Sequence, residues 1–437
     1  MSRELRDSGV GWLGSVPADW GTVPAQALFG ERKAKSTASD VHLTPSQKYG
    51  VLPQEEYMQI TGNKVVLNLT GADNMRHVET GDYVSHLRSF QGGLEYARIP
   101  GKVSAAYTVL KPKVALDSRF FRYLFKSELY VQALQTTTDQ LRDGQSIRYP
   151  QFSQIALPQP SLDEQRAIAD YLDRETAQID AFIAKNEELI ALLAERRAAT
   201  ITSALTSGRE ESTGSCDGRW FGAIPAHWES MPLRYLLRRI EQGVSPQAEG
   251  GLAEGAHQFG VLKSGCVNAG IYRSTEHKLL PAEFDFDRSL LVRPGDLVVN
   301  RASGSIPLLG SAAIVTQSPY RLILSDKTFR LIPNARTSSH YLYWLLNSRI
   351  YREQVESRVS GADGLANNLP QSTLKRFVLP VPPIEEQDQI SSYLTDRCTQ
   401  IDKSIATARR GAALARERRA ALISAAVTGK VDGREAS

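Results

Sequence analysis

The residue pair Asn300 and Arg301 directly follows a Gly-Asp turn and the short apolar run Leu297–Val299. An arginine side chain can donate two hydrogen bonds to guanine, and an asparagine side chain can donate to and accept from adenine. Ser303 follows in the same polar segment, where its hydroxyl could donate to a phosphate. We therefore predict a loop here that reads base edges in the major groove of DNA.

Other polar segments carry the same residue types. In the second half of the chain they contain Lys263, Asn268 and Arg273. In the first half, a basic cluster and two polar segments supply Arg32, Lys33, Lys35, Gln47, His86, Arg88, Ser89 and Gln91. Such side chains can hold DNA by its phosphates, and those on loops can also reach base edges. For each single residue, an ordinary solvated surface position is the alternative to DNA contact.

Motifs of the common catalytic and metal-binding sites do not occur in the sequence. It has no GxxxxGK[ST] loop, no GxSxG elbow, no HExxH pair and no Asn-Pro-Pro-aromatic motif. Cys216, Cys266 and Cys398 are isolated and the histidines are scattered, so neither a disulfide framework nor a zinc site is indicated. We expect no catalytic residue, no metal site and no cofactor bound by this chain.

Length and composition indicate a folded protein of several domains. The 437 residues, 41% of them apolar, exceed what a single core usually organises. Lys and Arg outnumber Asp and Glu in residues 1–160 and 207–380 but are outnumbered in 161–206. Mildly basic globular parts suit a polyanion, although many inert proteins share this balance. Since neither a membrane-span pattern nor a secretory signal occurs, we expect a soluble, cytoplasmic protein without membrane contact.

Two long helices are predicted at 161–206 and 383–429. The stretch Ser161–Leu205 has no glycine or proline, and its apolar residues recur at helical spacing along one narrow seam. The first seam consists of Ile168, Leu172, Ile179, Ile183, Ile190, Leu193, Ile201 and Leu205. Adding 222 to each number gives apolar residues again, namely Ile390, Leu394, Ile401, Ile405, Ala412, Ala415, Ile423 and Val427. A narrow seam needs a partner helix, so we expect the two helices to pair as an antiparallel coiled coil.

The duplication extends beyond the helices. GWLGSVPADWGTVP at Gly11–Pro24 returns as RWFGAIPAHWESMP at Arg219–Pro232, and VETGDYV at Val78–Val84 matches VRPGDLV at Val292–Val298. Between these anchors the two copies diverge, which indicates one scaffold with two different faces; drift of surface loops is the alternative. We predict an α+β protein with a pseudo-two-fold internal repeat. Its predicted parts are globular domains at 1–160 and 219–382, long helices at 161–206 and 383–429, a linker at 207–218 and a tail at 430–437.

Each globular domain opens and closes with a characteristic segment. The opening segments are GWLGSVPADW and RWFGAIPAHW, and the closing segments, which run into the long helices, are LPQPSLDEQRAIADYLDRETAQID and LPVPPIEEQDQISSYLTDRCTQID. This paired pattern resembles the specificity subunit of type I restriction–modification enzymes. The resemblance covers essentially the whole chain; Pro383 in place of Ser161 and the small residues Ala412 and Ala415 are minor departures. It implies that each globular domain recognises one half of a bipartite, asymmetric double-stranded DNA target. It also implies that the helices set the gap between the halves.

The resemblance further implies partners that carry the chemistry. Two methyltransferase subunits would dock on the helices and use S-adenosylmethionine, and restriction or motor subunits would use ATP and Mg. The residues implied in partner binding are Gln165, Arg196, Arg197, Gln387, Arg418 and Arg419. A coiled-coil scaffold that binds proteins and not DNA is the alternative from another class, and charged residues at helical spacing often form only a solvated face.

Overall fold

The structure is a computed structural model, which describes residues 4–63, 74–86, 89–136, 147–208, 220–247, 250–255, 257–359 and 367–431. Arg88, most of the predicted linker and most of the predicted tail lie outside the described residues. The chain forms two compact units, unit 1 from Met1–Glu187 with Arg409–Ser437 and unit 2 from Glu188–Ala408. Each unit thus contains a globular part and portions of both long helices.

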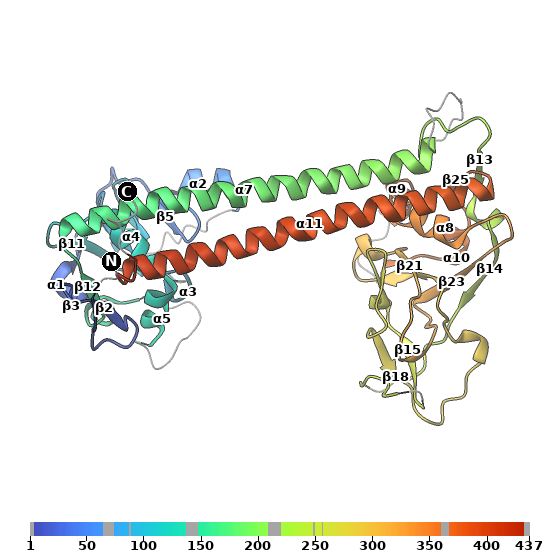
Figure 1. Ribbon diagram of the computed structural model, residues 1–437, viewed down its shortest axis with the longest axis horizontal. Helices are drawn as coiled ribbons and strands as arrows, with labels where there is room; N and C mark the ends of the chain where they lie inside the picture. Colours follow the sequence, from blue (N-terminus) through green and yellow to red (C-terminus); the bar gives the residue numbers. More distant parts are fainter. Residues whose placement is uncertain are drawn as a thin grey trace. The chain divides into compact units, whose positions relative to one another are not determined.

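Unit 1 combines short antiparallel strands with short helices (Figure 1). Its largest sheet has the order β4-β11-β8-β9, and strand β12 pairs with β3 just before the first long helix. The strands are β1 (Leu5–Asp7), β2 (Ser15–Pro17), β3 (Gly21–Pro24), β4 (Phe29–Glu31), β5 (Leu43–Ser46), β6 (Gly50–Pro53), β7 (Arg76–Val78), β8 (Tyr83–Val84), β9 (Glu95–Tyr96), β10 (Gly101–Val103), β11 (Val109–Pro112) and β12 (Ala156–Gln159). The helices are α1 (Ala25–Leu28), α2 (Gln54–Thr61), α3 (Ser89–Gly92), α4 (Ser118–Lys126), α5 (Glu128–Thr136) and α6 (Tyr149–Ser153).

The core of unit 1 is rich in aromatic side chains. Phe29 is fully buried, and its ring centroid lies 5.6 Å from that of Tyr83 and 5.1 Å from that of Phe121, in edge-to-face geometry. Phe121 lies on helix α4. Asp117 caps the start of this helix and accepts hydrogen bonds from the backbone N–H groups of Arg119 and Phe120. The core thereby joins the sheet to the helix.

Unit 2 is built on a four-stranded antiparallel sheet of order β14-β23-β19-β21, with a smaller sheet of order β18-β15-β22. The strands are β13 (Glu229–Pro232), β14 (Leu237–Gln242), β15 (Phe259–Leu262), β16 (Val267–Asn268), β17 (Ile271–Tyr272), β18 (His277–Leu279), β19 (Leu297–Asn300), β20 (Ala302–Ser303), β21 (Ala312–Ile314), β22 (Arg321–Ile323), β23 (Thr328–Pro333), β24 (Asn367–Asn368) and β25 (Val378–Val381). The α-helices are α8 (Ser339–Leu346), α9 (Arg349–Val359) and α10 (Gln371–Leu374). The mixed content confirms the predicted α+β class.

The long helices are α7 (Leu162–Ser207) and α11 (Ile384–Val427), which Figure 1 shows as uninterrupted helices. Every residue of the two predicted apolar seams is buried or half-buried. In unit 1, Leu172 of α7 and Val427 of α11 belong to the same core as the aromatic residues. In unit 2, Leu205 of α7 and Ile390 of α11 pack in the core under the sheet. Each core therefore includes side chains from both long helices.

The Gly-Asp turns of the two units hold arginines. In unit 1, Asp82 is 1% exposed, accepts a hydrogen bond from the Glu79 backbone N–H at 2.8 Å, and accepts two from Arg32 at 2.5 and 3.0 Å. The hydrogen bond to Asp82 raises the pKa of the Arg32 guanidinium. In unit 2, Asp296 lies 2.8 Å from Nη1 of Arg330. These turns therefore hold a half-buried arginine in unit 1 and a buried arginine in unit 2.

No helix among the described residues is long and apolar enough to cross a membrane.

Replacing Asp82 by alanine removes the acceptor of a partly buried arginine and the cap of the turn. We expect Asp82→Ala to lower the free energy of unfolding of the chain by about 3 kcal/mol. Urea unfolding followed by circular dichroism measures this change. Asp163→Ala is the control, because the Asp163 side chain is 93% exposed and its pair with Arg166 should contribute less than about 1 kcal/mol. Equal losses in both variants would contradict the structural role of Asp82.

Candidate DNA interface

A surface hollow of about 310 Å³ in unit 2 contains Arg301. Its lining comes from segments far apart in sequence: Ser264, Arg301, Ala302, Ser303, Gly304, Asp326, Lys327 and Asn368. Strand β20 brings these segments together, because Ala302 pairs with Asn368 across β20 and β24. The hollow presents two cationic side chains together with hydroxyl and amide groups, a set of donors that suits phosphates and base edges.

Arg301 is half-buried at this hollow. Its guanidinium donates to Oδ1 of Asn368 from Nε at 3.1 Å and from Nη2 at 2.9 Å. Nη1 donates to the backbone carbonyl of Asp326 at 3.3 Å, and the guanidinium carbon lies 5.3 Å from the ring centroid of Phe329. The predicted reading residue is thus held on several sides.

Asn300, its predicted companion, is placed differently. Its side chain is 1% exposed, and Oδ1 accepts a hydrogen bond from the Ala302 backbone N–H at 3.2 Å. In this conformation Asn300 shapes the turn that leads into the hollow and does not reach its surface. Ser303 does line the hollow, where its hydroxyl accepts a hydrogen bond from the backbone N–H of Ser305 at 3.1 Å.

The remaining predicted residues of unit 2 lie on the neighbouring segment. Lys263 directly precedes Ser264 of the hollow, and its Nζ lies 4.0 Å from Oε2 of Glu276. Asn268 is half-buried in β16, and Arg273 is exposed just after β17. Of these three, only Lys263 adjoins a residue that lines the Arg301 hollow.

Gln47 and Gln91 of unit 1 belong to adjacent segments. Gln47 lies at the exposed tip between β5 and β6, and Gln91 is exposed in α3. The two segments approach so closely that a Cβ atom at Gly92 would lie 2.6 Å from Cδ of Gln47. Gln47 also lines a cleft of about 550 Å³ whose cationic residues are Lys48, Arg98, Arg122, Lys126 and Arg419. This cleft brings a predicted DNA contact next to positive charge, although Glu95, Asp173 and Asp180 line it too.

The basic cluster of unit 1 is split by its contacts. Arg32 is engaged with Asp82, as described above, whereas Lys33 is 81% exposed at its side chain and Lys35 is exposed. His86 is buried, with Nε2 at 3.4 Å from Oε1 of Glu95. Ser89 begins α3. Of the basic residues Arg32, Lys33 and Lys35, the two lysines are the ones that are exposed to solvent.

The two signature glutamines make equivalent buried contacts. Gln165 accepts from the Asp117 backbone N–H at 2.9 Å and donates to the Pro160 carbonyl at 3.0 Å. Gln387 accepts from the Ser338 backbone N–H at 2.9 Å and donates to the Pro382 carbonyl at 2.9 Å. Both side chains are buried. Gln165 thus links the start of α7 to the start of α4, and Gln387 links the start of α11 to the start of α8. Their assignment to partner binding gains no support from these contacts and stays a prediction.

The arginines predicted to bind partners divide into two pairs. Arg197 lies 2.9 Å from Asp402 in unit 2, and Arg419 lies 2.8 Å from Asp180 in unit 1. These ion pairs link α7 with α11 within each unit. Arg196 and Arg418 are exposed, and no ion pair is found for either of them among the described residues.

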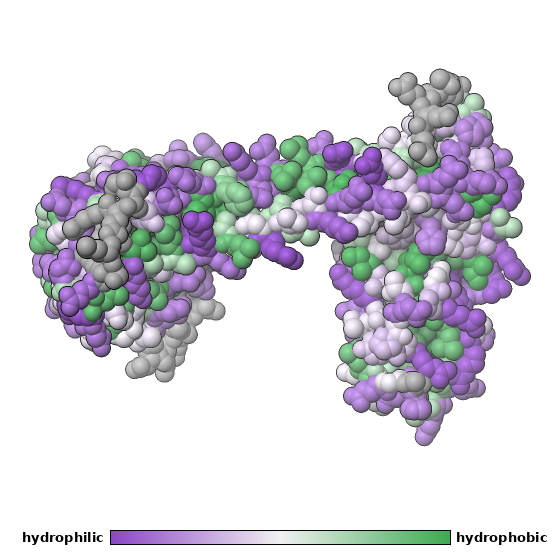
Figure 2. All heavy atoms as spheres, viewed as in Figure 1, coloured by the Kyte–Doolittle hydropathy of each residue, from purple (hydrophilic) through white to green (hydrophobic). Residues whose placement is uncertain are grey.

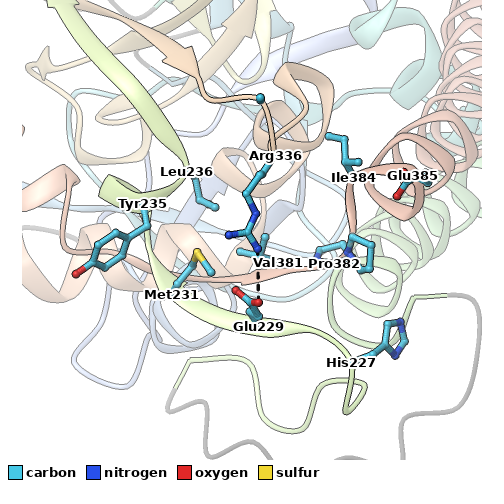
Figure 3. A pocket seen from close by; sticks show the side chains of 12 residues that line it. His227, Glu229, Met231, Tyr235, Leu236, Arg336, Val381, Pro382, Ile384 and Glu385 are labelled. Atoms are coloured by element: carbon cyan, nitrogen blue, oxygen red, sulfur yellow. Dashed lines mark ion pairs between the residues drawn. The ribbon is translucent and has the colours of Figure 1, made fainter.

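A different hollow of unit 2, of about 330 Å³, lies at the start of α11 (Figure 3). Arg336 points toward Glu229, and their charged atoms are 3.6 Å apart. Glu385 adds a second carboxylate, while Met231 and Leu236 supply apolar surface. Two carboxylates face one arginine here, whereas one carboxylate, Asp326, accompanies Arg301 and Lys327 in the Arg301 hollow, so we assign this hollow no DNA contact.

Comparison with known proteins shows which proteins this chain resembles. Residues 283–407 match the family model described as Type I restriction modification DNA specificity domain. The EcoKI specificity subunit of Escherichia coli strain K12 is 24% identical over 286 residues, which cover 64% of this chain and 59% of that protein. The EcoEI specificity subunit of Escherichia coli is 27% identical over 180 residues, or 40% of this chain and 29% of that protein. The matches thus span less than two thirds of these relatives.

Solved structures agree on the fold. One solved chain has a TM-score of 0.64 at 14% identity, and the match covers 95% of this chain and 99% of that one. It comes from a structure described as the structural basis of complex assembly and conformational transition of the type I R-M system. The HsdS subunit of Thermoanaerobacter tengcongensis has a TM-score of 0.55 at 15% identity, covering 95% and 98%. The family match of residues 283–407 and the curated relatives confirm the predicted resemblance to specificity subunits of type I restriction–modification systems, and the solved structures show the same fold.

Sequence reasoning missed Lys327 and Asn368, which line the Arg301 hollow. Both lie far from Arg301 in sequence, and nothing in the polar segments that contain them indicates that they lie beside Arg301. Only the strand pairing of β20 with β24 and the turn before β23 place them there.

Removing the Gln387 side chain distinguishes an internal role from a partner-binding role. Gln387→Ala leaves a buried N–H and buried carbonyls without partners, so we expect a loss of about 2–3 kcal/mol in unfolding free energy of the isolated chain. Arg418→Ala, at an exposed position, should change it by less than about 0.5 kcal/mol. Chemical denaturation of the purified chain without partners provides both values. Unchanged stability in Gln387→Ala would contradict the internal role.

Proposed function

We propose that this chain is a sequence-specific DNA-binding specificity subunit of a type I restriction–modification complex. Each globular part would read one half of a bipartite, asymmetric target. One observation carries the proposal: residues 283–407, which match a DNA specificity domain, contain every residue that lines the Arg301 hollow except Ser264. Arg301, Ser303 and Lys263 are the proposed DNA contacts of unit 2, and Gln47, Gln91, Lys33 and Lys35 are those of unit 1.

We assign the gap between the half-sites to α7 and α11, paired as an antiparallel coiled coil. The ion pairs Arg197–Asp402 and Asp180–Arg419 support this. Adding 222 to Arg197 gives Arg419, and adding 222 to Asp180 gives Asp402, so the internal repeat makes the two pairs equivalent. Such a correspondence is expected when two copies of one unit pair about a pseudo-two-fold axis. The buried seam residues would supply most of the pairing energy, since exposed ion pairs contribute little.

Methyltransferase subunits are the proposed partners of the long helices. Figure 2 shows apolar patches among hydrophilic side chains along these helices. The exposed apolar residues include Phe182, Leu189 and Leu192 of α7 and Leu414 of α11. Together with the exposed Arg196 and Arg418, they provide surface that a partner protein could cover. In this proposal, S-adenosylmethionine, ATP and Mg are bound by the methyltransferase and motor subunits, and this chain has no catalytic residue.

Replacing Arg301 tests the assignment of unit 2 to a single half-site. We expect Arg301→Ala to relax the base preference in one half of the target and to leave the other half unchanged. Adenine methylation, mapped across the genome of cells that express the variant with its cognate methyltransferase subunit, provides the recognised motif. Arg349→Ala in α9 is the matched control, because its side chain is 81% exposed and lies outside the hollow. Equal weakening of both halves would contradict the assignment.

The salt dependence of binding separates DNA recognition from the scaffold alternative. Contacts with phosphates release counterions, so affinity for duplex DNA should fall linearly on a log–log plot against salt concentration. Fluorescence anisotropy of the complex of this chain with its methyltransferase subunit, titrated with labelled duplex at several salt concentrations, measures the slope. A complex that forms but binds duplex DNA at no salt concentration would favour the protein-binding scaffold.

A further inference from the structure

The guanidinium of Arg301 is oriented before any ligand arrives. Asn368 Oδ1 occupies the edge formed by Nε and Nη2, and the Asp326 carbonyl accepts from Nη1. Beneath it lies Phe329, which is 1% exposed and therefore cannot move aside without disturbing the core. Asn368 at one edge of the guanidinium, the Asp326 carbonyl at Nη1 and Phe329 against its face together fix the plane and the direction of the group.

These contacts leave a defined pair of donors. A guanidinium carries five N–H bonds, and three of them are used by Asn368 and Asp326. One N–H on Nη1 and one on Nη2 have no acceptor among the described residues. Two donors on neighbouring nitrogens match the spacing of the O6 and N7 acceptors of guanine in the major groove.

The backbone around Arg301 is held as firmly as the side chain. Arg301 donates its N–H to the Lys327 carbonyl at 2.9 Å, and its own carbonyl accepts from the Leu369 N–H at 2.7 Å. The same β20–β24 pairing places Asn368 opposite Ala302. Because this segment is ordered in the free chain, little conformational entropy is lost when the guanidinium meets a base.

We propose that Arg301 recognises a guanine in the half-site read by unit 2, and that Asn368 is the positioning residue that aims its guanidinium. This inference rests on the proposed function and deepens it. Lys327 has a different role at the same hollow. Its side chain is 53% exposed, and its ammonium, which lies 2.7 Å from Asp326, is a compact charge that suits a phosphate. Base preference and backbone affinity thus come from separate residues.

The test uses the full chain in complex with its methyltransferase subunit and duplexes selected from a randomised library. In the selected target, each guanine is replaced in turn by 7-deazaguanine, which lacks the N7 acceptor. We expect one position in one half-site at which this replacement weakens binding about tenfold or more. Arg301→Ala should bind the two duplexes equally, since its contact is already absent.

Asn368 variants separate positioning from folding. Asn368→Ala should reduce the discrimination at that guanine while leaving the melting temperature of the chain near that of the wild type, because Asn368 is exposed. Asn368→Asp keeps an acceptor for Nε and Nη2 and should retain the discrimination. As a comparison, Lys327→Ala should weaken binding equally on guanine and 7-deazaguanine duplexes and reduce the salt slope by about one.

Three outcomes overturn the inference. If the complex binds its target but Arg301→Ala weakens binding to all duplexes alike, Arg301 contacts a phosphate, and the guanine assignment fails while the proposed function stands. If Asn368→Ala keeps full discrimination, the positioning role fails. A complex that binds no duplex at all would overturn the proposed function as well.

Discussion

Burial of the long-helix seams is the constraint on which the rest of this structure depends. A narrow apolar stripe on a helix cannot be shielded by the helix itself, so α7 and α11 must be covered over most of their length. In unit 1 the ends are covered by the aromatic core around Phe29, and in unit 2 by the core beneath the sheet of β19 and β23. Neither globular core is complete without side chains from both helices. The helices are therefore structural parts of each unit as well as connections along the chain.

The same physical devices recur where each helix begins. A buried glutamine, Gln165 or Gln387, satisfies backbone groups that the proline-rich entry to the helix leaves without partners. Away from the helix starts, a turn aspartate, Asp82 or Asp296, pairs with an arginine in each unit. In Glu241, which shares Arg330 with Asp296, burial alone would raise the pKa of the carboxyl, but the hydrogen bonds and charges of Arg330 and Arg239 together outweigh burial and lower it. This shared framework contrasts with the polar surfaces, which differ between the units, and the contrast agrees with the proposal that the two units read different half-sites.

Sequence reasoning succeeded where a pattern is local and periodic. The seams, the long helices and the Gly-Asp turns follow from spacing, so they could be predicted residue by residue. It was less informative for the site, because residue type and loop position do not reveal burial. Asn300 and Arg301 are adjacent and equally polar, yet the first is buried in a turn and the second lies at the hollow. Asn368 reaches that hollow through strand pairing between distant segments, which no local pattern indicates.

The central claim is that this chain selects the DNA sequence on which a separate enzyme acts. The most direct measurement maps methylated adenine across the genome in cells that express the cognate methyltransferase subunit with and without this chain. The account predicts a split motif, two short specified halves around a gap of constant length, that disappears when the chain is absent. A methylation pattern that does not depend on the chain, despite a stable complex and an active methyltransferase, would contradict it.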